Sequence, residues 1–176
     1  ELNLEHNRLF YPGIALTDGT GYYSINNIAP LFRWGMESAY LQSTMPGTGS
    51  YNLWDTKKLI PDFIVVNLGT NDNVSGSGTR EIERFGKAYE RLLNTLRTAY
   101  PNAEIFVLEM VSVSSSDKDA RQETIKNTVE TMGDSKIHYV PTRDWNAEIS
   151  GDNIHPTQNG HRTITNKLKE ILQSYL

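Results

Sequence analysis

The sequence alternates short apolar runs with longer segments of helical periodicity, and this alternation constrains the fold more than any other feature. Residues 62–68 (DFIVVNL) and 104–110 (EIFVLEM) are rich in β-branched and aromatic residues and are bounded by loop residues, which is typical of buried parallel strands. Between these runs, apolar residues recur at helical spacing, and Pro101 ends the segment. These residues are Ile82, Phe85, Tyr89, Leu92, Leu93 and Leu96. The pattern predicts a strand–helix–strand crossover.

The same alternation continues to the C-terminus. Residues 118–132 and 157–175 are predicted as helices, residues 136–141 as a strand between them, and residues 7–11 as a weak strand candidate near the N-terminus. This order is typical of the α/β class, and we expect a three-layer α/β/α sandwich with a parallel sheet. A chain of 176 residues with 38% hydrophobic residues is long enough for a full core, so we expect residues 1–176 to form a single domain.

Composition argues against several classes of partner. The formal net charge is −4 and no run of Lys or Arg occurs, so a nucleic-acid partner is not expected. No apolar run approaches the roughly 20 residues of a membrane span, so no membrane partner is expected either. Cysteine is absent, which excludes disulfides, a thiolate nucleophile and a Cys-ligated zinc site. Secretion and a cytoplasmic location both stay open.

Three loops rich in glycine or polar residues follow predicted strands. NLGTND (residues 67–72) leaves the run at 62–68, YPGIALTDG (residues 11–19) leaves the segment at 7–11, and GDNIHP (residues 151–156) follows the last strand. In open parallel sheets, ligands bind at the carboxyl ends of the strands, where such loops meet. The sequence therefore predicts one site formed by these three loops.

The third loop pairs an acid with a base. Asp152 precedes His155 by three residues, a spacing at which one short turn can hold an imidazole beside the carboxylate that orients it. Such a histidine can take a proton from a nucleophile and return it to a leaving group. The alternative is that His155 is a surface histidine beside a turn proline. Together with His161 the two residues match no strong zinc spacing, so no metal is expected.

GTND (residues 69–72) after a hydrophobic strand and DNIHP (residues 152–156) near the C-terminus resemble the third and fifth sequence blocks of the SGNH or GDSL-type hydrolases. The resemblance extends from about residue 8 to the C-terminus, and PDFIVVNLGTND and GTGSYNLWD are most similar to carbohydrate acetyl esterases. It implies a serine esterase that deacetylates a carbohydrate through an acyl-enzyme, without a cofactor. It also implies that Asp152 and His155 belong to the catalytic triad.

The resemblance further implies which groups stabilise the oxyanion. Asn71 would donate from its side-chain amide, a group suited to a tetrahedral oxyanion when it is fixed at a strand end. Gly13 would donate from its backbone, with Gly19 or Gly21 as alternatives because Leu16 breaks the family's usual glycine spacing. Asp72, beside Asn71, is expected to hydrogen-bond backbone rather than to titrate in catalysis.

The family's nucleophile is the serine of a Gly-Asp-Ser turn between the first strand and the first helix, and this sequence has Gly-Asp-Ser at residues 133–135. A predicted helix precedes the tripeptide and a predicted strand follows it, which is the reverse of the context that a nucleophile turn requires. We therefore expect an ordinary turn, with Ser135 far from His155. The other serines considered do not join a buried strand to a helix either: Ser24, Ser38 (placed on a short helix), Ser50 and Ser114 to Ser116. The expectation is that the first strand and the nucleophile lie outside residues 1–176, in a companion segment or in the part of a longer polypeptide that precedes Glu1.

Trp34 and Trp54 lie in segments that lead to the site, where an indole could stack on a sugar ring. Burial in the core is an equally open alternative for both. Two other functions also stay open for the chain. One is a lysophospholipase or thioesterase-like hydrolase acting on a longer acyl chain, and the other is a non-catalytic carbohydrate-binding module on the same fold.

Overall fold

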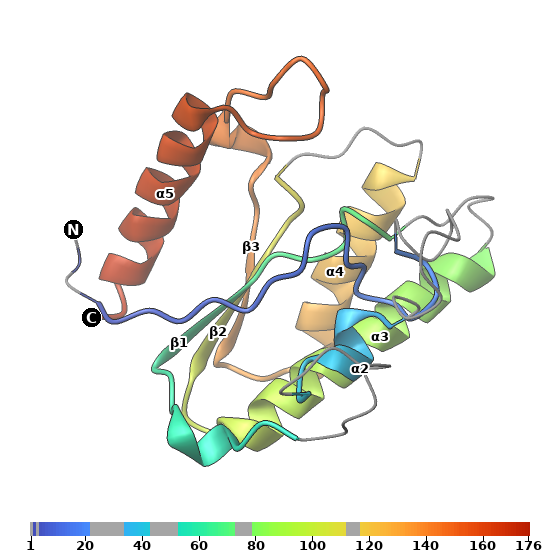
Figure 1. Cartoon of the computed structure of the whole chain (residues 1–176), viewed down its shortest axis with the longest axis vertical. Coiled ribbons are helices and arrows are strands. Elements are labelled where there is room, and N and C mark those ends of the chain that lie inside the picture. The colour runs from blue at the N-terminus through green and yellow to red at the C-terminus, as the bar shows by residue number, and fades with distance from the viewer. Residues whose placement is uncertain (1, 3, 22–33, 43–52, 73–78, 112–116) are drawn as a thin grey trace.

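The computed structural model has a parallel three-stranded sheet with helices on both of its faces (Figure 1). The strands are β1 (Phe63–Val66), β2 (Glu104–Leu108) and β3 (Ile137–Val140), and they lie side by side in chain order. Residues 2, 4–21, 34–42, 53–72, 79–111 and 117–176 are described by the structure. The three apolar runs read as strands in the sequence are thus the three strands of the described sheet.

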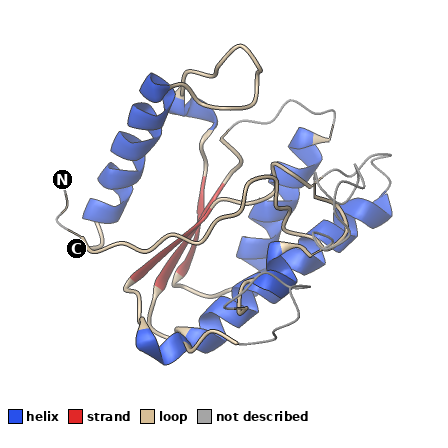
Figure 2. Cartoon of the chain, in the orientation of Figure 1, coloured by secondary structure: helices blue, strands red, loops and turns tan. Residues whose placement is uncertain are grey.

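Helices cover the sheet as the sequence periodicity predicts (Figure 2). They are α2 (Met36–Ala39), α3 (Thr79–Ala99), α4 (Lys118–Met132) and α5 (Gln158–Gln173), with short 3-10 helices at Thr56–Lys58 and Arg143–Trp145. The apolar residues spaced along α3 form its buried face: Phe85, Ala88, Tyr89, Leu92, Leu93 and Leu96. Helix α5 begins where the Thr157 side chain accepts a hydrogen bond from the amide of Gly160, at 3.1 Å.

The side chains of β2 point alternately into two hydrophobic cores, one on each face of the sheet. Ile105 and Val107 pack among residues of α3 and α4, whereas Phe106 and Leu108 pack on the opposite face, where α5 covers them. Successive side chains of a strand point to opposite faces, so a central strand with four apolar residues in a row, 105–108, requires helices on both sides. The three-layer α/β/α sandwich expected from the sequence is confirmed.

Residues 7–11, expected as a weak strand, are not a strand in the structure, and that prediction is wrong. The segment is extended, but no β-bridge joins it to another described residue. An extended segment becomes a strand only when its backbone pairs with a neighbour. Strand β1 is correspondingly an edge of the described sheet, because it pairs only with β2. Val65, in the middle of β1, keeps 38% of its surface exposed.

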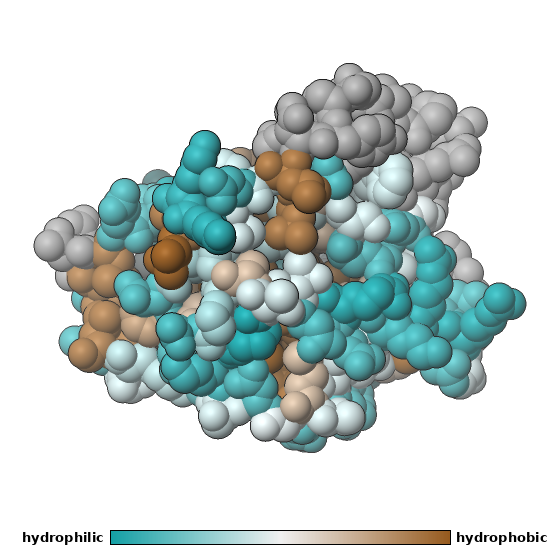
Figure 3. Space-filling model, turned by 90° about the horizontal axis from the view of Figure 1, so that it is seen from below, coloured by the Kyte–Doolittle hydropathy of each residue, from teal (hydrophilic) through white to brown (hydrophobic). Residues whose placement is uncertain are grey.

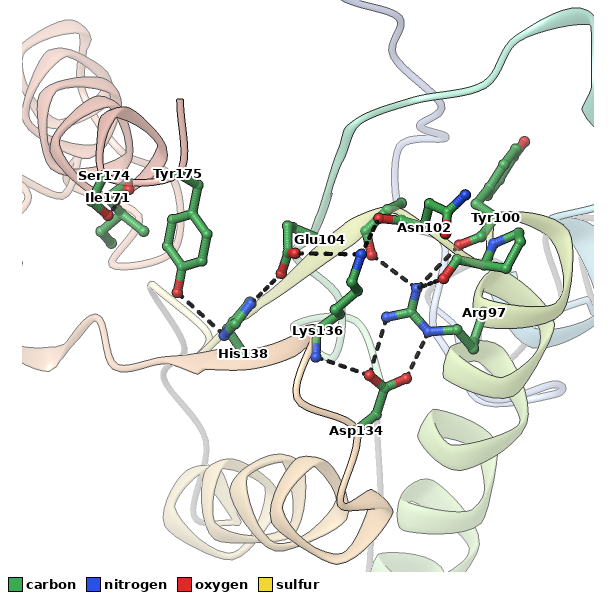
Figure 4. Close-up of polar contacts among 12 residues, drawn as sticks. Arg97, Tyr100, Asn102, Glu104, Asp134, Lys136, His138, Ile171, Ser174 and Tyr175 are labelled. Atoms are coloured by element: carbon green, nitrogen blue, oxygen red, sulfur yellow. Dashed lines mark hydrogen bonds and ion pairs between the residues drawn. The ribbon is translucent and has the colours of Figure 1, made fainter.

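The edge at which the strands begin is closed by polar contacts (Figure 4). Here Nε2 of His138 lies 2.7 Å from a carboxylate oxygen of Glu104, and its ring stacks on Phe106. The hydroxyl of Tyr175 lies 3.3 Å from Nδ1 of the same histidine. These contacts give His138 a structural role at this edge of the sheet. Seen from this end, hydrophobic residues gather in separate patches among hydrophilic ones (Figure 3).

Candidate active site

The loops that follow the three strands all leave the opposite, upper edge of the sheet in Figure 1. The loop after β3 folds back on itself before α5. The amide of Ser150 donates to the carbonyl of His155 at 2.8 Å, and that of Thr157 donates to the carbonyl of Glu148 at 2.9 Å. Within this turn Asn153 adopts the left-handed conformation, with φ of 60°. Local backbone bonds thus bring residues 150 and 155 together.

Asp152 and His155 form the pair that the sequence predicts. Oδ2 of Asp152 lies 2.6 Å from Nδ1 of His155. The other oxygen, Oδ1, accepts hydrogen bonds from the Ser150 hydroxyl at 2.6 Å and from the amides of Ile154 and His155, each at 2.9 Å. These bonds, led by that from Ser150, hold the pKa of Asp152 far below its usual range. Asp152 is therefore an anion that orients the imidazole.

The imidazole of His155 presents its second nitrogen outward. Its side chain is 77% exposed, and Nε2 has no hydrogen-bond partner among the residues that the structure describes. A histidine held through Nδ1, with Nε2 open, has the arrangement required of a general base. Exposure alone would fit a surface histidine as well, but a surface histidine does not need an oriented carboxylate.

Asn71 lies at the end of β1 and is fixed to the first loop. Its Nδ2 donates to the carbonyl of Ile14 at 3.1 Å. A carboxamide nitrogen carries two hydrogens, so this bond orients the amide and leaves one N–H for a ligand. The first loop itself begins with a turn in which the amide of Ile14 donates to the carbonyl of Tyr11, at 3.1 Å. Gly13 has φ of 74° there, after Pro12, as the third position of a type II turn requires.

Asp72 anchors the first loop instead of facing the site. It is almost fully buried, and its carboxylate accepts from the amides of Leu16 at 2.7 Å and Thr17 at 2.9 Å. Burial raises the pKa of Asp72, and these amide bonds oppose the rise. The backbone role expected for Asp72 agrees with these contacts. Through it the loop that holds Gly13 and the turn that holds Asn71 become one unit.

Arg121, on α4, holds this unit through hydrogen bonds, a role that was not identified from the sequence. Its side chain is 2% exposed, and Nη1 donates to the carbonyls of Gly69 and of Asp72, the latter at 2.8 Å. Nη2 meets Oδ1 of Asp117 at 2.9 Å. One signal was available: Arg121 lies four residues before Ile125, and Ile125 four before Val129, so a charged residue occupies a core position of α4.

Glu109, just after β2, holds the start of the third loop in a similar way. Its buried carboxylate accepts from the amide of Thr142 at 3.0 Å and from Nε of Arg143 at 2.7 Å. Burial tends to raise the pKa of Glu109, but the bonds from Arg143 and Thr142 outweigh it and lower the pKa. A charged Glu109 thus fixes the chain as it leaves β3 toward Asp152.

The Gly133-Asp134-Ser135 tripeptide is the ordinary turn expected. Gly133 ends α4 in the left-handed conformation, with φ of 60°, and Asp134 is 2.6 Å from Nε of Arg97 (Figure 4). Ser135 precedes β3 and His155 follows it, so they lie at opposite ends of that strand. Ser38 lies on the short helix α2, as predicted. Ser24, Ser50 and Ser114 to Ser116 are outside the described residues.

Trp34 and Trp54 are both exposed, so neither belongs to the core. The amide of Trp54 donates to the carbonyl of Leu41 at 2.7 Å, which ties its segment to the chain after α2. No cluster of three or more His, Asp or Glu side chains in the described ranges could hold a metal ion. Of the helices that the structure describes, none is long and apolar enough to cross a membrane.

The sequence model of the GDSL-like Lipase/Acylhydrolase family matches residues 16–163. The chain is 26% identical, over 99% of its length, to the cellulase/esterase CelE of Acetivibrio thermocellus, and 28% identical, over 76% of its length, to an acetylxylan esterase / glucomannan deacetylase of Cellvibrio japonicus. It spans only 20% and 37% of these relatives.

Solved structures of carbohydrate esterases have the same fold. An active-site mutant of a family two carbohydrate esterase from Clostridium thermocellum is 26% identical, with a TM-score of 0.65 over 92% of this chain and 48% of that one. A structure of a family two carbohydrate esterase from the same organism, in complex with cellohexaose, is 24% identical with a TM-score of 0.66, again over 92% of this chain and 48% of that one.

Proposed function

Because the chain belongs to the GDSL-like lipase/acylhydrolase family, we propose that it supplies the acid, the base and the oxyanion donors of a serine esterase that removes acetyl groups from a carbohydrate. The observation that carries this proposal is the Asp152–His155 pair, with Nδ1 bound and Nε2 open at the end of β3. The relatives named for esterase and deacetylase activity support the reaction class and the kind of substrate.

In the proposed reaction, a serine hydroxyl attacks the ester carbonyl while Nε2 of His155 takes its proton. Asp152 stabilises the imidazolium through Nδ1, and the free N–H of Asn71 donates to the oxyanion of the tetrahedral intermediate. Gly13 is the proposed backbone donor. When the intermediate collapses, His155 returns the proton to the sugar oxygen, leaving the acyl group on the serine. Water then repeats the sequence on the acyl-enzyme and releases acetate.

We propose that the nucleophilic serine comes from a strand outside residues 1–176 that pairs with the free edge of β1. Two observations support this. Edge strands in natural proteins are usually blunted or covered, whereas β1 is apolar throughout, with Val65 exposed. The described serines are also placed unsuitably. Ser135 lies at the opposite end of β3 from His155, and Ser174 lies at the far end of α5. The hydroxyls of Ser38 and Ser150 already donate to the carboxylates of Asp18 and Asp152. A strand beside β1 would end next to Asn71 and the Gly13 turn.

The exposed indoles of Trp34 and Trp54 are proposed to contact the sugar. Aromatic faces stack on sugar rings, and both side chains keep more than a third of their surface exposed. The bound cellohexaose of the Clostridium thermocellum esterase supports a saccharide as ligand. A non-catalytic module would use these residues without needing His155, so the experiment below separates the two functions.

The test is deacetylation of acetylated xylan by the natural polypeptide that contains residues 1–176, with acetate release as the readout. His155→Ala should lower kcat by about three or more orders of magnitude, because the general base is lost. His161→Ala, also an exposed histidine at the start of α5, is the matched control and should keep full activity. Activity of His155→Ala within about tenfold of the wild type would reject the assignment.

A further inference from the structure

We propose that Ser150 is a positioning residue of the acid–base pair, an inference that deepens the esterase function proposed above and rests on it. Its hydroxyl donates to Oδ1 of Asp152 at 2.6 Å, whereas His155 contacts the other oxygen, Oδ2. Ser150 therefore touches the acid and not the reacting base, and it acts on His155 only through Asp152.

The contacts of the carboxylate show what the hydroxyl contributes. Oδ1 also accepts from the amides of Ile154 and His155, so three donors occupy this oxygen and leave Oδ2 to the imidazole. The two amides belong to the backbone of the turn, which leaves Ser150 as the one side-chain donor to Oδ1 among the described residues. Without it, rotation of the carboxylate about Cβ–Cγ would be resisted by the amides alone.

Backbone hydrogen bonds hold Ser150 in position independently of its hydroxyl. The amide of Ser150 donates to the carbonyl of His155 at 2.8 Å, and its carbonyl accepts from the amide of Asn153 at 3.0 Å. Both bonds remain when the hydroxyl is removed, so Ser150→Ala should keep the turn. The hydroxyl is then a separate element of the site, dedicated to the orientation and charge of Asp152.

The pKa of Asp152 is a readout that a purely structural role of Ser150 would not change. A hydrogen bond to an ionised carboxylate favours the ionised form, and Ser150 is the largest contributor to the depressed pKa of Asp152. Losing the hydroxyl should therefore let Asp152 protonate at higher pH. Protonated Asp152 no longer supports the imidazolium, so the additional loss of activity should appear as the pH falls toward the usual carboxyl range, about 4.

The first measurement is a ¹³C NMR titration of the Asp152 carboxyl in the natural polypeptide that contains residues 1–176, a readout that needs no esterase activity. In Ser150→Ala the pKa of Asp152 should rise toward its usual range, and in Ser150→Thr it should stay depressed. Ser174→Ala is the matched control, because that hydroxyl donates only to the carbonyl of Ile171, at the end of α5, and it should leave the titration unchanged. An unchanged pKa of Asp152 in Ser150→Ala would overturn the proposal.

The second measurement is the pH profile of acetate release by the natural polypeptide. Ser150→Ala should lower kcat about tenfold near neutral pH, the factor expected for one charge-assisted hydrogen bond, with KM nearly unchanged and larger losses at acid pH. Ser150→Thr should restore activity. A loss equal at all pH values that Thr does not restore would contradict a positioning role. Full activity of His155→Ala would instead reject the esterase function, whatever the titration shows for Ser150.

Discussion

Arg121→Met should be the most destabilising substitution near the site, because it removes a buried cation that holds three groups. The guanidinium contacts the carbonyls of Gly69 and Asp72 and the carboxylate of Asp117, and the Asp117 side chain is only 8% exposed. Met fills a similar volume but leaves Asp117 buried without its cation.

The expected loss follows from these contacts. Breaking a buried ion pair by removing one partner costs about 3–5 kcal/mol. For a domain of this length, each kcal/mol lowers Tm by about 2–4 °C, so Tm should fall by about 6–20 °C. Arg121→Lys keeps the charge but not the planar fork that meets both carbonyls, and it should cost about 1–3 kcal/mol.

Urea unfolding followed by circular dichroism measures these values. Lys126→Met is the matched control on the same helix. Lys126 is exposed, and its Nζ makes only a long contact of 4.0 Å with Oε1 of Glu130, so the substitution should change the free energy of unfolding by less than about 0.5 kcal/mol. A loss below about 1 kcal/mol for Arg121→Met would show that this side chain does not hold the turn carrying Asn71.

Three further outcomes are expected. Asn71→Ala should lower kcat of the natural polypeptide by about 10²–10³ with little change in KM, and an unchanged kcat would mean that Asn71 only shapes its loop. Hydrogen bonds depress the folded-state pKa of Asp152, so the contribution of this carboxylate to stability is complete above the unfolded pKa of about 3.9 and is lost only as the pH falls through the lower folded pKa. The ¹³C carboxyl signal of the folded protein should therefore still report an anion at about pH 3.9, and a half-protonated Asp152 at that pH would contradict the geometry. Ser135→Ala should leave acetate release and the free energy of unfolding unchanged. Asp134→Ala loses the contact with Arg97 and should lower the free energy of unfolding in urea by about 1–2 kcal/mol, and an unchanged value would show that this turn does not depend on Asp134.

Local patterns in the sequence were sufficient for the parts of the fold that depend on near neighbours. The helix at residues 79–99 and the strands after residues 62, 103 and 136 follow from apolar spacing, because each buries its own regular stripe or run. The Asp152–His155 pair was predictable for the same reason, since three residues of one turn create it. The strand expected at residues 7–11 was predicted wrongly, because an extended segment becomes a strand only beside a neighbouring strand, and the described sheet provides none there.

The supports of the site could not be predicted from local patterns. Arg121 meets the carbonyl of Gly69 across 52 positions of the chain, and Asp72 meets the amide of Leu16 across 56. Such contacts depend on how α4 and the first loop pack against the end of β1, which spacing along the chain does not encode. A charged residue in an apolar stripe, as at Arg121, is the one trace that this packing leaves in the sequence.

In the proposed active site, residues 1–176 hold the base and the nucleophile comes from outside them. A fluorophosphonate forms a covalent bond with an activated serine, so labelling the natural polypeptide and mapping its peptides locates the nucleophile. We expect a labelled serine outside residues 1–176 and loss of the label in His155→Ala. A His155-dependent label on any serine between Glu1 and Leu176 would place the nucleophile within these residues and reject the proposal.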